Sequence, residues 1–112
     1  MQKPQKSEIQ LLHAEVCQAL ADPTRIMLLY LIAEGQKSVG DLAVALDLSQ
    51  PTASRHLKVL RERGMVKTER FGATIIYSLT DRRVIEALDL LRAVMTDNLL
   101  QKTALVDLLN QA

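Results

Sequence analysis

The chain has 112 residues and is 48% hydrophobic, with one Phe and two Tyr as its aromatic residues, so one domain with an aliphatic core is expected. A single cysteine excludes an internal disulfide, and two histidines leave little material for a metal cage. No apolar run is long enough to span a membrane and the first residues lack the apolar stretch of a signal peptide, which favours a cytoplasmic protein without a membrane partner. We expect neither a cofactor nor an enzyme, because no Gly-rich phosphate loop, nucleophile set or acidic pair stands out.

The net charge of +1 is unevenly distributed along the chain. Residues 50–70 contain six basic and two acidic side chains, a net charge of +4, so the remaining residues carry −3. A polyanion would therefore meet one face of the protein. Basic side chains that are merely solvated on an exposed helix and hairpin would give the same pattern, so charge alone does not establish nucleic-acid binding.

Two helices are expected in the first third of the chain. Ser7, three residues before a glutamine, gives a capping-box signature, and apolar residues then keep helical spacing to about residue 20. Asp22 before Pro23 is a second start signal, and Gly35 is a stop signal. The segment between them is apolar nearly all round, which predicts a helix buried at the centre of the domain.

A helix-turn-helix is expected next. Ser38 with Asp41 marks the start of a brief third helix that continues to about residue 46. Only residues 47–49 separate it from a further amphipathic helix over residues 49–64. A turn of three or four residues between two short amphipathic helices is typical of this motif.

The helix over residues 49–64 has an apolar back, a small polar tip and a basic flank. Ser49 is expected to cap it, Pro51 is tolerated in its first turn, and Gly64 suits its left-handed end. Its spacing places three residues toward the core: Ala53, Leu57 and Leu60. Three others fall on the opposite side: Ser54, Arg55 and Lys58. One face of this helix is therefore expected to pack while the other reaches out, as in a helix that enters a DNA groove.

A hairpin and a long helical segment complete the chain. Residues 65–70 and 73–79 are expected to form two strands around Phe71 and Gly72, with Arg70 near the tip. Such a hairpin can reach toward nucleic acid or simply cover the core. Helical spacing resumes at residue 80 or 81, and a possible restart at residues 96–98 leaves one helix of about 30 residues or two helices open. Its apolar seam exceeds what the domain can cover, which favours a two-fold pairing of the first and last helices.

This order of elements is that of a winged helix, and the residues resemble the ArsR/SmtB family of bacterial repressors over about residues 14–95. The resemblance rests on Ala-Leu-Ala-Asp-Pro-Thr-Arg at 19–25, on the whole helix at 49–64, and on Tyr-Ser-Leu at 77–79. It implies a mainly α winged helix-turn-helix with a small β-hairpin wing, a single DNA-binding domain over residues 1–112 that dimerises through its first and last helices. Such homodimers bind operators and block transcription until an inducer, often a metal ion, weakens the DNA-bound form.

Carried over by position, the resemblance implies these DNA-binding residues: Gln50, Thr52, Ser54, Arg55, His56, Lys58 and Arg70. The fork of Arg55 can bind guanine O6 and N7 together, and Gln50 can pair with adenine. Thr52, Ser54 and Lys58 are expected to hold phosphates. His56 lies on the flank of the helix, where a phosphate contact and a packing or capping role are both open.

The departures from the family remove its best-known metal sites. The Cys-Val-Cys motif of the arsenic and cadmium sensors corresponds here to residues 38–40, Ser-Val-Gly, which supply no thiolate. The zinc-sensor positions of the last helix correspond to Asp81, Arg83, Val94 and Asp97, which supply no imidazole. The inducer, if there is one, is therefore not identified by the sequence.

Cys17 is the remaining candidate for a sensor. Its neighbours Val16 and Leu20 favour a plain core cysteine. The alternatives are a redox- or persulfide-responsive thiol, and a zinc set made with His13 and duplicated in a dimer.

We therefore expect a homodimeric repressor that binds double-stranded DNA at an imperfect palindrome, with its two recognition helices in successive major grooves. Binding is expected to depend steeply on salt. The alternative from another class is a winged helix used only for protein interaction or dimerisation, although small, polar and basic residues on the exposed face do not suit that role. A regulator without an inducer, controlled by its own concentration or by a partner, is also open.

Overall fold

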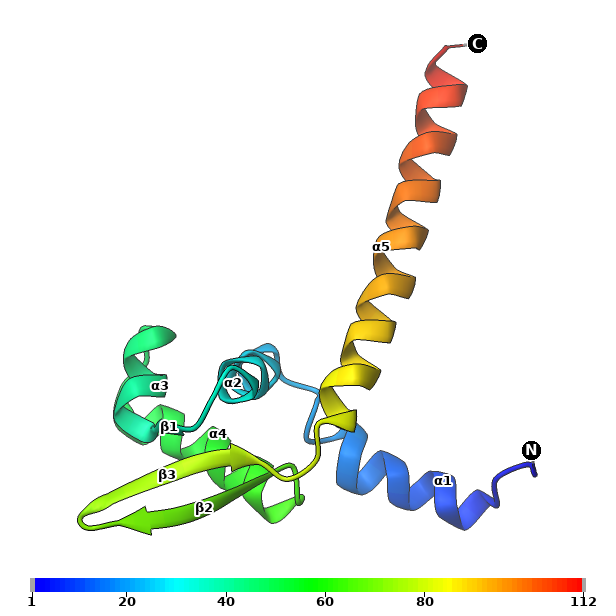
Figure 1. Ribbon diagram of the computed structural model, residues 1–112. Helices are drawn as coiled ribbons and strands as arrows, with labels where there is room; N and C mark the ends of the chain where they lie inside the picture. Colours follow the sequence, from blue (N-terminus) through cyan, green and yellow to red (C-terminus); the bar gives the residue numbers. More distant parts are fainter. Residues whose placement is uncertain (1, 112) are drawn as a thin grey trace. The chain divides into compact units, whose positions relative to one another are not determined.

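The computed structural model describes residues 2–111 and divides into two units, one ending at Arg82 and one beginning at Arg83. The first unit contains α1 (Lys6–Leu12), the π-helical turn η1 (His13–Cys17), α2 (Pro23–Ala33), β1 (Lys37–Ser38), α3 (Val39–Ala45), α4 (Gln50–Glu62), β2 (Val66–Phe71) and β3 (Thr74–Leu79) (Figure 1). The second unit is the single helix α5 (Arg83–Asn110). The winged helix-turn-helix expected from the sequence is confirmed.

The first helix begins earlier and ends sooner than predicted. Gln5 is its N-cap residue, and the Ile9 N–H donates to the Gln5 carbonyl oxygen at 3.1 Å, which places Ser7 inside the first turn. The predicted cap at Ser7 is therefore wrong, because the backbone of the first turn already continues through that residue. The helix widens into η1, where the Gln18 N–H donates to the His13 carbonyl oxygen at 3.0 Å, and helical structure stops at Cys17 rather than near residue 20.

Local caps fix the next two helices as predicted. One carboxylate oxygen of Asp22 accepts the backbone N–H groups of Thr24 at 2.8 Å and Arg25 at 3.4 Å. The Ser38 hydroxyl oxygen accepts the Asp41 N–H at 3.1 Å and starts α3 in the same way. Helix α2 contributes three buried side chains to the core: Leu28, Leu29 and Ile32.

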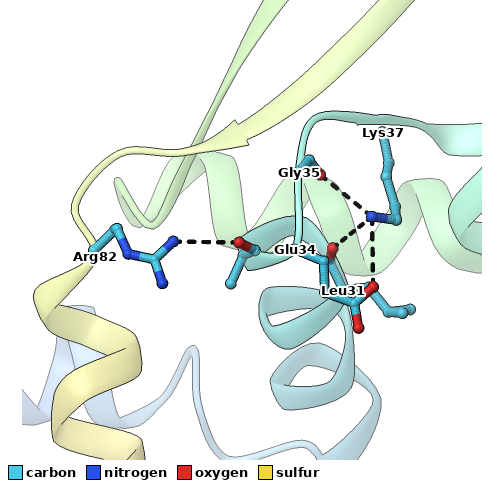
Figure 2. Close-up of polar contacts among 6 residues, drawn as sticks. Leu31, Glu34, Gly35, Lys37 and Arg82 are labelled. Atoms are coloured by element: carbon cyan, nitrogen blue, oxygen red, sulfur yellow. Dashed lines mark hydrogen bonds and ion pairs between the residues drawn. The ribbon is translucent and has the colours of Figure 1, made fainter.

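Side chains from two other segments close the C-terminal end of α2 (Figure 2). The Lys37 ammonium donates to the carbonyl oxygens of Leu31 at 2.9 Å and Gly35 at 3.4 Å, and lies 3.7 Å from a Glu34 carboxylate oxygen. The Arg82 guanidinium donates to the carbonyl oxygen of Ala33, the last residue of α2, at 3.2 Å. These cations donate to carbonyl groups in the last turn of α2 and just beyond it, and their positive charge suits the negative end of the helix dipole.

The wing is a three-stranded antiparallel sheet in the order β1-β3-β2, whereas the sequence predicted two strands. Strand β1 pairs Lys37 with Tyr77, but its two residues are too few to show an alternating pattern. In the hairpin Phe71 pairs with Thr74, so the turn is Gly72–Ala73, one residue later than predicted. Gly72 has φ +63°, a left-handed value that suits glycine in a tight hairpin turn.

The last segment is one helix of 28 residues that begins at Arg83, two or three residues later than predicted. Residues 96–98 lie within it and do not start a second helix, which decides between the two alternatives that the sequence left open. Ile85 and Leu88 in its first two turns are buried. Ten large apolar side chains beyond them are exposed: Leu90, Leu91, Val94, Met95, Leu99, Leu100, Leu105, Val106, Leu108 and Leu109. Within residues 2–111, helices of membrane-spanning length and hydropathy are absent.

Candidate nucleic-acid interface

Helix α4 separates its apolar and polar side chains onto opposite faces. Ala53, Leu57 and Leu60 have no solvent-exposed surface, and the helix packs against α2, α3 and β2. Ser54, Arg55 and Lys58, the residues predicted to point away from the core, are exposed. The sequence therefore predicted the orientation of this helix correctly, and packing on one face fixes which side chains the other face presents.

A small hydrogen-bond network organises the N-terminal end of α4. The Ser49 hydroxyl oxygen accepts the Thr52 N–H at 3.3 Å and is 2.9 Å from Thr52 Oγ1. The Arg55 guanidinium Nη2 donates to Thr52 Oγ1 at 3.2 Å. This contact uses one of the five N–H donors of an exposed guanidinium, so donors remain for a planar acceptor.

Gln50 and Lys58 lie at the two ends of this exposed face. Gln50 is exposed at the first position of α4. Its side chain extends over Gly40 of α3, where Nε2 lies 3.5 Å from the position that a Cβ on Gly40 would take. The Lys58 ammonium lies 4.0 Å from a Glu62 carboxylate oxygen, with both side chains more than half exposed. An exposed pair at that distance contributes little, so Lys58 can exchange it for a phosphate at small cost.

His56 differs from the other candidate residues on α4. It is half-buried, and its Nδ1 lies 3.5 Å from Nη1 of Arg25 on α2. The structure thus connects His56 to a neighbouring helix, whereas Arg55 and Lys58 are exposed. The sequence assigned no role to Arg25, although its place after the Asp22–Pro23 start signal and at the end of the motif at residues 19–25 puts it in the first turn of α2.

The wing carries a second exposed group of candidates. Arg70 and Phe71 end β2 beside the Gly72–Ala73 turn, and Phe71 is 56% exposed. Arg70 lies opposite Ile75 in the hairpin, so it extends from a paired strand rather than from a loop. An exposed cation and an exposed aromatic ring near the tip of a hairpin can each contact a phosphate backbone or a groove wall.

The predicted sensor residues lie together on η1, but Cys17 is not a core cysteine. Both His13 and Cys17 are exposed, and η1 has no buried residue, so the core interpretation of Cys17 is wrong for this chain. The helix that precedes η1 also lacks buried residues, which explains why nothing covers the thiol. Within the described residues 2–111, no cluster of three or more His, Cys, Asp or Glu side chains could hold a metal ion.

Comparison with known proteins places this geometry among regulators. Residues 22–68 match the sequence model described as "Bacterial regulatory protein, arsR family". A biofilm growth-associated repressor of Agrobacterium fabrum is 43% identical over 89 residues, which cover 77% of this chain and 76% of that protein.

Two solved structures are similar to the fold. The homodimeric winged helix-turn-helix DNA-binding domain of a possible ArsR-family regulator from Mycobacterium bovis is 29% identical, with a TM-score of 0.71 over 87% of this chain and 92% of that one. The transcriptional repressor BigR from Xylella fastidiosa is 32% identical, with a TM-score of 0.67 over 81% of this chain and 96% of that one.

Proposed function

The chain belongs to the ArsR family of bacterial regulatory proteins, and from that premise we propose that it is a homodimeric transcriptional repressor that reads an imperfect palindromic operator. As a transcriptional regulator it is not an enzyme. The observation that carries the proposal is helix α4, whose core face is wholly buried while its other face presents polar and basic side chains to solvent. This is the arrangement that a recognition helix in a major groove requires.

We assign each residue a proposed DNA contact from its position on the helix and its side-chain chemistry. Arg55 reads a guanine, because its fork can donate to O6 and N7 together, and Gln50 pairs with an adenine. Thr52, Ser54 and Lys58 hold phosphates and fix the register of the helix. Arg70 contacts DNA from the wing, beside the exposed Phe71.

A second copy of the chain is the proposed partner for the exposed apolar surface of α5. Contiguous apolar surface of this kind marks an interaction site, and α1 adds three further exposed residues: Ile9, Leu11 and Leu12. A self-complementary pairing of both helices would bury both sets at a two-fold axis. Two recognition helices related by that axis read half-sites about 34–36 Å apart, which is why the operator is expected to be palindromic.

We do not propose a metal ion at either of the family's two best-known metal sites as the inducer. Residues 38–40 supply a helix cap rather than thiolates, since the Ser38 hydroxyl oxygen accepts the Asp41 N–H. The positions that match the zinc sensors, Asp81, Arg83, Val94 and Asp97, supply no imidazole.

The exposure of Cys17 favours a second candidate, a thiol-responsive repressor, because an exposed thiol can form a disulfide with a second subunit or with a small thiol. Comparing wild type with Cys17→Ser, and with His13→Ala, in the presence of oxidants, persulfides and Zn²⁺ tests this input. Unchanged DNA affinity of wild type under all three treatments would contradict it and favour a repressor without such an inducer.

Selection of duplexes from a random-sequence library tests the DNA-binding proposal. We expect recovery of a two-fold symmetric sequence, bound with an affinity that falls steeply as salt concentration rises. Sedimentation of the complex should give two protein chains per duplex. Enrichment of no sequence, or binding indifferent to salt, would contradict the proposal and favour a protein-interaction module.

A further inference from the structure

One guanidinium joins three parts of the first unit. Arg25 Nε donates to the carbonyl oxygen of Ala19 at 2.7 Å, and Nη2 donates to that of Gln18 at 3.0 Å. Its third nitrogen, Nη1, lies 3.5 Å from Nδ1 of His56. The side chain therefore connects the turn after η1, the start of α2 and the middle of the recognition helix α4.

The direction of the hydrogen bond between Arg25 and His56 determines the tautomer of the imidazole. A guanidinium can only donate hydrogen bonds, so Nδ1 of His56 must accept and must carry no proton. The neutral ring then holds its proton on Nε2. The contact exists only for this tautomer, which makes it sensitive to the protonation of His56.

Two charged groups at the start of α2 interact with the imidazole. They are the guanidinium of Arg25 and the carboxylate of Asp22, whose interaction with His56 is electrostatic. Burial raises the pKa of Asp22, but the hydrogen bonds from the Thr24 and Arg25 N–H groups, together with smaller electrostatic contributions from His56 and Arg25, outweigh burial and hold that pKa below its ordinary value.

Neighbouring charged groups on α4 and η1 are directed to other partners. On α4, Arg55 donates to Thr52 and Lys58 faces Glu62. Glu15 on η1 accepts from Arg63, the C-cap residue of α4, at 3.1 Å. The segment around η1 is therefore attached to the recognition helix at two places. Glu15 holds the C-terminal end of α4, and Arg25 holds the middle of α4.

We propose that Arg25 is a positioning residue for DNA recognition, which holds α4 in register with the turn after η1 by donating to Nδ1 of His56. The inference rests on the DNA-binding role proposed above. In this role His56 accepts a hydrogen bond that positions α4, and it does not contact a DNA phosphate. Arg25 acts through His56 and contacts no nucleotide itself.

The two roles of His56 differ in the sign of their pH dependence. Protonation removes the acceptor at Nδ1 and sets an imidazolium beside a guanidinium, so in the positioning role DNA affinity falls as pH is lowered from about 8 to about 5.5. In a phosphate-contacting role the new positive charge would instead raise affinity over the same range. His13 is the other histidine of the chain, so His13→Gln serves as the background for all pH measurements.

Two isosteric replacements separate the roles in the full-length protein, with the duplex that wild type selects as the probe. His56→Asn keeps an acceptor near the Nδ1 position and should retain affinity within about twofold, whereas His56→Gln displaces it and should lose about tenfold. Arg25→Lys, which cannot form all three contacts, should also lose about tenfold, with an unchanged dependence on salt. Circular dichroism and thermal unfolding confirm that each variant folds.

The opposite pattern would overturn the proposal. The first contradicting result is that His56→Gln retains DNA affinity while His56→Asn loses it. If the slope of log affinity against log salt concentration also falls by about the contribution of one phosphate contact, His56 contacts the DNA backbone. ¹⁵N spectra of the imidazole in the protein without DNA give an independent reading. We expect an Nε2–H tautomer in wild type that is altered in Arg25→Lys; an unaltered spectrum would exclude the contact even if the protein bound no DNA and the proposed function failed.

Discussion

Helices α4 and α5 differ in where their apolar side chains lie. In α4 the three residues at core spacing are all buried, with no exposed surface. In α5 only Ile85 and Leu88 are buried, and apolar side chains from Leu90 to Leu109 are at least half exposed. Packing within a single chain explains why the core-facing positions of α4 are apolar. It does not explain most of the apolar residues of α5, which stay exposed.

This difference indicates which surfaces serve which kind of partner. Exposed side chains of α4 are mostly small, polar or basic, with Glu62 as the acidic exception, which suits a polyanion. Those of α5 are predominantly aliphatic, which suits a protein surface such as a second copy of the same helix. Mutations in the two helices should therefore have separable effects on folding, assembly and DNA binding.

The largest expected effect is loss of stability when the core face of α4 is truncated. Leu57→Ala removes a fully buried side chain and should lower the free energy of unfolding by about 2–5 kcal/mol. Urea denaturation measures the change. The matched control is Leu91→Ala on α5, where the side chain is 63% exposed within the chain and the same truncation should change dimer dissociation more than folding. Equal effects on folding would contradict the comparison.

The next largest effect is expected on assembly. Leu99→Lys places a charge within the exposed apolar surface of α5 and should weaken dimerisation by at least about 2 kcal/mol, since an unpaired ammonium is costly to bury. Sedimentation equilibrium gives the dissociation constant. Gln101→Lys adds the same charge at a polar position of the same helix and should change it less. A dimer indifferent to Leu99→Lys would place the interface elsewhere.

A moderate effect is expected from the exposed face of α4. Arg55→Ala should cost about 1–3 kcal/mol of DNA binding and relax preference at one base pair, because it removes a bidentate contact. Lys58→Ala should weaken all sequences alike and reduce the salt slope by about one unit, as expected for a phosphate contact. Titration against duplexes with single base changes distinguishes them. Uniform weakening by Arg55→Ala would refute its base-reading role.

The smallest effect concerns the cap at the start of α2. The pKa of Asp22 in the folded chain is below its ordinary value of 3.8, so its cap contributes fully above that value and is lost as pH falls through the folded pKa. Wild type should therefore lose thermal stability on acidification below about pH 4. Asp22→Asn retains an acceptor but cannot titrate, so its unfolding temperature should fall less steeply over that range. Parallel acid profiles would show that other carboxylates dominate.

Local chemistry explains which elements the sequence predicted well. Asp22, Ser38 and Ser49 each accept N–H groups two or three residues ahead, so the starts of α2, α3 and α4 are encoded within one turn. The capping signature at Ser7 failed because the helix had already begun at Lys6. Strand β1 escaped notice because it exists only through its pairing with β3.

The candidate site shows the same division. Spacing alone predicted that Ala53, Leu57 and Leu60 are buried and that Ser54, Arg55 and Lys58 are exposed. The contact between His56 and Arg25 joins residues 31 positions apart, which no periodicity predicts. Cys17 was expected in the core because its neighbours are apolar, but the end of the helix in η1 leaves it exposed.

The sequence by itself determined the order of the helices, the caps of α2, α3 and α4, the buried face of α4 and the resemblance to a family of repressors. These features depend on residues within a few positions of one another, where backbone geometry leaves few choices. Tertiary structure decided the third strand and the attachment of the recognition helix to η1 through Arg63 and to the turn after η1 through Arg25. Those depend on which distant groups meet, and that is set by how the whole chain excludes water and satisfies its polar groups.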